Sequence, residues 1–489
     1  MLGKDSGQRD FFDMGVEDLV PENHILMQIE RAIDFSFVQD AIKHVYSTGM
    51  GRPSYPPLVL FKMLLLEYFY NLSDVRVSQE CRYNLLFRRF IGLAVRDKVP
   101  DDTTLVYFRK RLGQQQFELL FDKVVQQAKD RGLIGNDLKI IDGTVIEANI
   151  CVFNGINILR QAREHIIRTI EKRNDTQSGL REKYLDKERI YSMPVSEQLK
   201  EEKEKTKQFI EEVKGRHGKP VEEKVNMLED ILGTEEGKLP AIKSFVDTDA
   251  RAGHSSKKKG FVGYKATVSF DDDSQLITSC HVLSGNENEG KHEHFKELVE
   301  RDEAKGIKHQ AVAGDGAYDS LANRQASHQM GMKAYFPSKR PNRQLNEFIY
   351  DREKETLTCK AGSDAISRTQ QGDGYLYIFS VEDCSNCNQK DNCPGKKNMD
   401  RARVFVSKDI LEKLKDETEE KQSALLKRKR IEKKFGEGKK WHGLARARYW
   451  GKCKVGIQVL LTFTVINLKR IAKLAEESGR LEQLPAENC

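Results

Sequence analysis

One stretch of the chain, residues 137–337, alternates between strand-like and helix-like patterns in a definite order. Alternating and β-branched residues predict strands, whereas apolar residues three and four positions apart predict helices. Three consecutive strands can pair as an antiparallel meander, and strands joined by helices can lie parallel. We therefore expect a mixed sheet with helices on its faces. The predicted order is strand, strand, strand, helix, strand, helix, strand, at residues 137–149, 261–271, 274–285, 292–303, 308–315, 320–330 and 333–337.

This order of elements matches the α/β fold of the ribonuclease H-like class, whose mixed sheet carries helices on its faces. We predict such a core over residues 131–475. Two insertions interrupt it: residues 155–237 are highly charged with helical patterns, and residues 338–420 contain a cluster of cysteines. Residues 476–489 form a predicted polar tail.

Residues 1–130 predict an all-α region of short helices separated by capping signals. Ser73 can cap a helix that starts near Asp74, and Asp101 belongs to a second capping signal. Two interpretations remain open for this region: a helix-turn-helix-like DNA-binding domain, or a plain helical bundle with solvated arginines. The basic residues concerned are Arg88, Arg89, Arg109, Lys110 and Arg111.

The composition describes a soluble, charge-rich protein that can still build a core. Of the 489 residues, 38% are hydrophobic and 32% are charged. The length allows two or three domains. The net charge of +7 is modest, so global charge alone does not indicate a nucleic-acid partner. The distribution is more informative, because basic residues crowd residues 421–454.

Neither a membrane span nor a secretory signal is expected. The longest apolar candidate, residues 455–468, contains Gln458 and Asn467 and is shorter than the ~20 residues that a bilayer requires, so it predicts a buried helix. The first residues lack an apolar signal core. The odd number of nine cysteines argues against a disulfide framework and for reduced thiols or a metal site. A cytoplasmic location is expected.

Three carboxylates from distant segments could converge on one site. Asp142 lies at the end of one predicted strand and Asp315 at the end of a later one, each next to glycine. Glu432 lies in a basic helix candidate, residues 425–440. Phosphoryl transfer on nucleic acid commonly uses two divalent ions held by such carboxylates. Each acid taken alone could equally be a capping or ion-pair residue, and their joint placement favours a metal site.

The basic helix places Arg428, Glu432 and Lys439 on one face, because offsets of four and seven residues nearly complete whole turns. Two glycines, Gly436 and Gly438, weaken a helix by up to about 1 kcal/mol each relative to alanine, so this helix could bend or end there. Two further acids, Asp319 and Glu437, are lower-ranked alternatives for metal binding.

Three segments resemble the catalytic blocks of bacterial insertion-sequence DDE transposases: I-I-D-G-T-V-I-E-A-N, A-G-D-G-A-Y-D-S and R-K-R-I-E-K-K-F-G-E-G-K. The third block of that family is a Y-x2-R-x3-E-x6-K signature. Arg428, Glu432 and Lys439 match its R, E and K, while Leu425 stands at the tyrosine position. The N-terminal stretch from G-R-P-S-Y-P-P to F-R-K-R-L and the segment W-H-G-L-A-R-A-R-Y are also similar to family segments.

The resemblance implies a transposase that binds the terminal inverted repeats of its element in double-stranded DNA, cleaves a strand and transfers it to target DNA. Asp142, Asp315 and Glu432 would hold Mg²⁺ or Mn²⁺, and Arg428 and Lys439 would contact phosphate or orient Glu432. A homo-oligomer is expected in the DNA complex. Two alternatives remain open: a catalytically inactive DNA-binding repressor, and a ribonuclease H-like nuclease without strand transfer.

Basic residues interleave with aromatic rings just after the basic helix, a pattern typical of contacts to phosphates and unpaired bases. The alternative is that Trp441 and Trp450 pack in the core beside exposed arginines. The predicted phosphate or DNA contacts are Arg428, Lys439, Lys440, Trp441, Arg446 and Arg448, with Arg109 and Arg111 from the N-terminal region.

Four of the nine cysteines are grouped in the second insertion. Cys384, Cys387 and Cys393 form a C-x2-C-x5-C pattern, and Cys359 lies upstream. Four thiolates make a complete tetrahedral set for structural Zn²⁺. The spacing departs from paired C-x2-C knuckles, so zinc binding and reduced free thiols both remain open.

Overall fold

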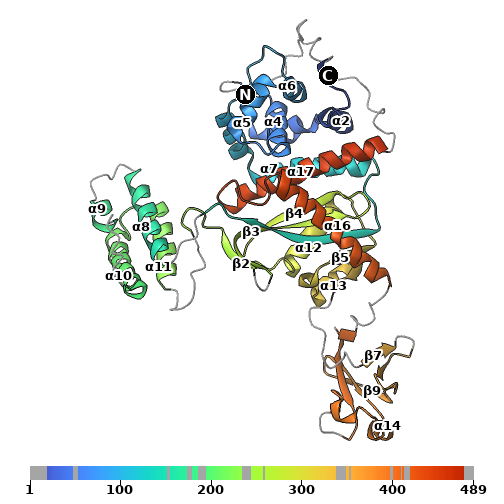
Figure 1. The fold of residues 1–489 in the computed structure, drawn as a ribbon. Coiled ribbons are helices and arrows are strands. Elements are labelled where there is room, and N and C mark those ends of the chain that lie inside the picture. Colours follow the sequence, from blue (N-terminus) through green and yellow to red (C-terminus); the bar gives the residue numbers. More distant parts are fainter. Residues whose placement is uncertain are drawn as a thin grey trace.

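Figure 1 shows the computed structural model of the chain, in which a central sheet lies beneath a group of N-terminal helices and two smaller units extend from it. The predicted tail lies almost wholly outside the described residues. These are residues 19–47, 53–150, 155–172, 179–185, 194–233, 244–256, 259–337, 348–351, 354–396, 400–408, 410–411 and 419–477.

The central sheet is mixed. Strand order is β2-β3-β1-β5-β6, and β4 also pairs with β3. β3 runs antiparallel to β1, β2 and β4, whereas β5 is parallel to β1 and β6 is parallel to β5. The expected meander followed by helical crossovers is therefore present. The strands are β1 (Leu138–Glu147), β2 (Arg251–Ser256), β3 (Lys259–Asp271), β4 (Ile277–Ser284), β5 (Ala311–Gly314) and β6 (Lys333–Tyr335).

One strand in this sheet was not predicted. β2 reads R-A-G-H-S-S, which lacks the alternating apolar residues that indicate a strand. Two glycines allow it to approach the end of β4 closely, since a Cβ at Gly253 would lie 2.0 Å from the carbonyl oxygen of Gly285. The position of β2 therefore depends on close backbone approach and on its pairing with β3, not on a pattern of side chains.

Helices cover both faces of the sheet. On one face α12 (His292–Ala304) and α13 (Leu321–Gln329) pack over Ile141. On the other face α16 (Glu419–Trp441) and α17 (Lys452–Glu477) contact β1 and β4. Because successive side chains of a strand point to opposite faces, Asp142 lies on the face of α16, opposite Ile141.

The described residues before Leu138 contain helices and loops only. Two predicted caps are confirmed: Ser73 accepts a hydrogen bond from the backbone N–H of Arg76, and Asp101 accepts one from that of Thr104. These helices share one continuous apolar core with the sheet and α17. They are α2 (Ile25–Ala32), α3 (Phe37–Ile42), α4 (Pro57–Phe69), α5 (Asp74–Tyr83), α6 (Leu85–Ile91) and α7 (Asp102–Asp130).

The predicted buried helix at residues 455–468 is confirmed as part of α17. In the described part of the chain α17 is the one helix long and apolar enough to cross a membrane, but 89% of its most apolar window is buried inside the protein. Its Gln458 side chain is buried and bonded to backbone groups of Gly443, Arg446 and Arg448.

The charged insertion is helical, as predicted, and it has an apolar core of its own that the charge pattern did not indicate. Arg163 is buried in that core and pairs with Glu202 at 2.6 Å. Figure 1 shows these helices as a bundle beside the sheet. They are α8 (Gly155–Glu171), α9 (Leu180–Tyr184), α10 (Val195–Val213) and α11 (Lys219–Leu232).

The cysteine-containing insertion forms a second small unit, below the sheet in Figure 1. We refer to its described residues between 348 and 411 as the cysteine module. Its core is a small apolar cluster between a two-stranded and a three-stranded sheet. The elements are β7 (Phe348–Asp351), β8 (Thr356–Cys359), β9 (Ser367–Gln371), β10 (Gly374–Ile378), α14 (Val381–Ser385) and β11 (Arg403–Ser407).

Candidate functional site

Asp142 and Asp315 lie at the same level of two adjacent parallel strands. Asp315 directly follows β5, as predicted, whereas β1 continues beyond Asp142 to Glu147, so Asp142 lies within its strand rather than at its end. Ile141 of β1 pairs with Gly314 of β5, and each aspartate is the residue that follows. Asp315 leaves the strand and caps a short 3-10 helix, where it accepts a hydrogen bond of 2.8 Å from the backbone N–H of Ala317. The topology thus brings together two acids that are distant in the sequence.

Arg428 connects this pair to α16. Its Nη1 donates a hydrogen bond to Asp142 Oδ2, and its Nη2 lies 3.7 Å from Glu432 Oε1, one turn further along the helix. The Glu432 side chain is 59% exposed, so it remains open to a ligand at the rim of the site. One guanidinium therefore lies between two of the predicted metal-binding carboxylates.

The electrostatics of Asp142 reflect a crowded acidic site. Burial raises the pKa of Asp142 to about 6, and the nearby Asp315 adds to the rise. The Arg428 guanidinium and a hydrogen bond from the Gly143 backbone N–H act in the opposite direction on this pKa. Burial and the nearby negative charge disfavour the ionised form of Asp142, while the arginine cation favours it. A carboxylate in this situation is suited to bind a further cation.

A third acid next to this pair, Glu289, was not predicted. It lies in the loop between β4 and α12, against the opposite face of β1 from Arg428: a Cβ at Gly143 would come within 2.3 Å of Glu289 Oε2. Burial raises the pKa of Glu289, and Asp315 and Asp142 add to the rise while Lys265 opposes it. The loop sequence N-E-N-E-G holds no signal that separates Glu289 from Glu287. Gly143, beside Asp142, was the one residue whose type indicated that another group approaches the strand closely here.

Tyr318 lies close to the three acids. It is fully buried, and its hydroxyl has no hydrogen-bond partner within the described part of the chain. Burial, with Glu289, Asp142 and Asp315 close by, raises its pKa well above the ordinary value. A buried hydroxyl without a partner beside converging carboxylates fits a site that takes up a further polar ligand, such as a metal ion with its waters.

The two lower-ranked acids are held in other ion pairs. Asp319 is buried and pairs with Arg324 at 3.0 Å. Glu437 pairs with Lys469 and lies 3.7 Å from His442; burial opposes ionisation, but these partners hold the pKa of Glu437 at about 2. Both acids therefore have structural roles in the folded chain.

The predicted helix 425–440 does not break at its glycines. α16 continues through Gly436 and Gly438 to Trp441. Gly438 is buried, and a Cβ there would lie 3.0 Å from Leu444 Cδ2, so the missing side chain allows the following segment to pack closely. Lys439 lies in the last turn of α16 and is half-buried.

An exposed basic and aromatic surface continues from the end of α16. Lys440 lies 4.7 Å from the centre of the Trp441 ring, and Trp441 is 58% exposed. Arg446 is exposed, and the backbone on either side of it pairs with Glu147 at the end of β1. Trp450 is 53% exposed, so neither tryptophan packs in the core.

Two of the predicted DNA contacts instead have partners inside the protein. Arg109 is buried, bonds to Glu67 at 3.1 Å and to Asp74 at 2.6 Å, and lies over the Tyr449 ring. Arg448 bonds to the other oxygen of Glu67 at 2.9 Å. These two arginines join the N-terminal helices to the segment after α16, because both guanidiniums hold one buried carboxylate. Arg111, by contrast, is exposed and lies 4.8 Å from the Tyr46 ring centre.

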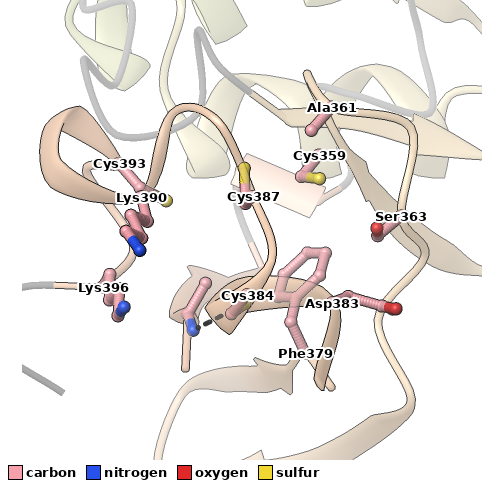
Figure 2. A pocket seen from close by; sticks show the side chains of 11 residues that line it. Cys359, Ala361, Ser363, Phe379, Asp383, Cys384, Cys387, Lys390, Cys393 and Lys396 are labelled. Atoms are coloured by element: carbon pink, nitrogen blue, oxygen red, sulfur yellow. Dashed lines mark hydrogen bonds between the residues drawn. The ribbon is translucent and has the colours of Figure 1, made fainter. Parts of the chain in front are cut away.

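The four grouped cysteines converge, and Figure 2 shows them around one pocket of the cysteine module. All four are partly buried and none forms a disulfide. They lie far along the chain from the aspartates, in a separate unit from the central sheet.

Two segments of the chain match transposase family models. Residues 15–111 match a model described as a transposase domain (DUF772), and residues 358–472 match one described as a transposase DDE domain. The second match includes Arg428 and Glu432. Together the matches support a DDE-type transposase.

The chain also aligns with a solved structure, described as a cryo-EM structure of a piggyBac transposase synaptic complex with hairpin DNA. The alignment has 10% sequence identity and covers 96% of this chain and 77% of that chain. Its TM-score of 0.33 is too low to transfer a fold or a function.

Proposed function

We propose that this chain is an insertion-sequence DDE transposase of the Y-R-E-K type, which binds the terminal inverted repeats of its element, cleaves them and joins the cleaved strand to target DNA. The observation that carries the proposal is the meeting of Asp142 and Asp315 on adjacent parallel strands, facing Arg428 and Glu432 of α16. The strand order, with β3 antiparallel to both β1 and β4 and with β5 and β6 parallel to β1, supports a ribonuclease H-like core.

The residues fit divalent metal ions. Asp142, Asp315 and Glu432 would hold Mg²⁺ or Mn²⁺, and Glu289 would supply a fourth carboxylate. Hard cations prefer such oxygen ligands, and among the described residues the buried Tyr318 hydroxyl beside them has no hydrogen-bond partner. Bound divalent ions would activate the attacking oxygen and stabilise the leaving one during phosphoryl transfer.

The remaining groups of the site position the acids and the DNA. Arg428 favours the ionised form of Asp142 and holds it near Glu432, so the two carboxylates are oriented before substrate arrives. With Asp142 serving as a metal ligand, the Arg428 guanidinium would be able to contact a phosphate instead. Lys439 in the last turn of α16 would add positive charge beside this path.

For the DNA interface we propose the surface formed by Lys440, Trp441 and Arg446, with Arg111 as a separate contact. Exposed cations supply phosphate affinity, and the exposed indole can stack on a base unpaired at the cleaved end. Cleavage at both ends of an element requires two active sites, so we propose a homo-oligomer in the DNA complex.

The test uses the full chain, oligonucleotide duplexes carrying the terminal repeats of the element, and Mg²⁺. We expect Asp142→Asn, Asp315→Asn and Glu432→Gln to abolish cleavage while binding of the end DNA is retained. The matched control is Glu420→Gln, which changes an exposed acid of the same helix that pairs with Lys333 instead.

Each outcome has a distinct meaning. Cleavage followed by joining to a target duplex supports the transposase. Cleavage without joining would indicate a nuclease, and specific end binding without cleavage in Mg²⁺ or Mn²⁺ would indicate a repressor. Full activity of any of the three carboxylate variants would remove that residue from the catalytic set.

A further inference from the structure

The cysteine module contains four thiols: three are neighbours in the sequence, and the fold brings Cys359 to them. Cys359 ends β8, Cys384 lies in α14, Cys387 follows that helix, and Cys393 follows the 3-10 turn Lys390–Asn392. All four line the same pocket, and Figure 2 shows Cys359 and Cys387 from different segments beside each other. Three separate parts of the module therefore contribute to one group of sulfurs.

Two of the sulfurs already accept backbone hydrogen bonds. The N–H of Ala402 donates to Cys384 Sγ at 3.4 Å, and the N–H of Gln389 donates to Cys387 Sγ at 3.4 Å. Both hydrogen bonds hold these two sulfurs in place at the pocket. The chains of Lys390 and Lys396 also line the pocket and add positive charge.

The apolar core of the cysteine module is small. That core is one small cluster, including Leu357, Tyr377 and Val406, and β9 is mostly exposed. Units this small usually depend on disulfides or metal ions for stability. All four cysteines are free thiols, so a metal ion bound to them would cross-link the module in place of disulfides.

We infer that Cys359, Cys384, Cys387 and Cys393 bind one structural Zn²⁺ ion as a tetrahedral four-thiolate site. The metal ties β8 to α14 and to the segment that follows α14, and it holds the module in its folded form. Its role is independent of strand cleavage, because the carboxylates of the central sheet belong to a different unit.

A second group of donor atoms must be separated from this site in any metal measurement. His281, His294 and Glu297 have ligand atoms within 4.8 Å of one another, closer than the cysteine sulfurs as they stand. These three residues already form ion pairs within the protein: His281 lies 3.0 Å from Glu297, and His294 lies 3.6 Å from Glu287.

The experiment measures metal content of the full chain, purified without chelators, by elemental mass spectrometry. We expect about one zinc ion per chain, as a closed four-cysteine site holds. The double variant Cys384→Ser/Cys387→Ser should lose at least nine-tenths of this zinc. Cys453→Ser, which changes an exposed cysteine of α17, and His294→Gln should both keep it.

A second measurement does not depend on the variants folding. Exchange of the wild-type protein into Co²⁺ should produce the intense sulfur-to-cobalt absorption of a tetrahedral thiolate site, with the four module cysteines protected from alkylation. A wild-type chain that contains no zinc and whose four module cysteines are all alkylated in the native state overturns the inference. So does zinc that survives Cys384→Ser/Cys387→Ser but is lost in His294→Gln.

Discussion

The carboxylate of Glu289 lies directly against the α-carbon of Gly143, so that a Cβ at position 143 would come within 2.3 Å of Glu289 Oε2. Gly143 follows Asp142 in β1, and alternation along the strand places the two residues on opposite faces of the sheet. The absence of a side chain at position 143 is what allows an acid from the α12 face to approach Asp142 and Asp315.

The first prediction concerns Gly143→Ala. The new methyl group must displace the Glu289 carboxylate, which is the far end of a flexible side chain, so the fold should survive while the acid moves. We expect cleavage of end DNA to fall roughly 10- to 100-fold, the usual cost of disturbing groups around a metal site, with weaker Mn²⁺ binding measured directly by titration. In a Glu289→Gln background the same substitution should cost much less. If the fold losses of the two single variants multiply in the double variant, the contact between position 143 and Glu289 is not the cause of the loss.

A second prediction separates internal arginines from DNA contacts. Arg109→Ala leaves Glu67 buried beside one fewer cation, so we expect the free energy of unfolding to fall by about 3–5 kcal/mol. Arg446→Ala removes an exposed cation and should leave stability unchanged, while the slope of log affinity for DNA against log salt falls by about one. Urea unfolding and salt titrations of DNA binding measure the two effects. If the Arg109→Ala protein is as stable as the wild type but has a reduced slope of log DNA affinity against log salt, Arg109 is a DNA contact after all.

The third prediction is a pH dependence at Glu437. Its pKa of about 2 lies below the ordinary value of 4.5, so its ionised form stabilises the folded chain. That stabilisation is complete above pH 4.5 and is lost as the pH falls towards 2, and its size at pH 7 is on the order of 3 kcal/mol. Glu437→Gln should therefore cost most at pH 7 and less than about half as much at pH 3, as measured by urea unfolding. A loss that is equal at both pH values would contradict this assignment.

The fourth prediction compares the two glycines of α16. Nothing lies within 4 Å of a Cβ at Gly436, so Gly436→Ala should raise the free energy of unfolding by up to about 1 kcal/mol and leave cleavage unchanged. Gly438→Ala gains the same helix propensity but pushes a methyl group to 3.0 Å from Leu444 Cδ2, so its net gain should be smaller. Chemical unfolding of both variants tests the comparison, and an equal gain would mean that Leu444 moves without cost.

Local patterns predicted much of this protein. The strand patterns around Asp142 and Asp315, the caps Ser73 and Asp101, and the apolar helix at residues 455–468 all lie where the sequence places them. Each depends on neighbours within a few residues, so the sequence alone determines it. The antiparallel pairing of β1, β3 and β4 and the helical crossovers after them also followed from these patterns, although β2 did not.

Partners distant along the chain could not be predicted in this way. Nothing near Glu289 distinguishes it from Glu287, and nothing near Arg109 or Arg448 shows that both hold Glu67. A buried charge takes its role from the residue that the fold places opposite it, often hundreds of positions away. The sequence by itself thus determined most strands and helices of the core and that Asp315 directly follows a strand, whereas Asp142, predicted near a strand end, lies within β1. Only the tertiary structure decided which charges neutralise one another inside the protein and which stay exposed to solvent.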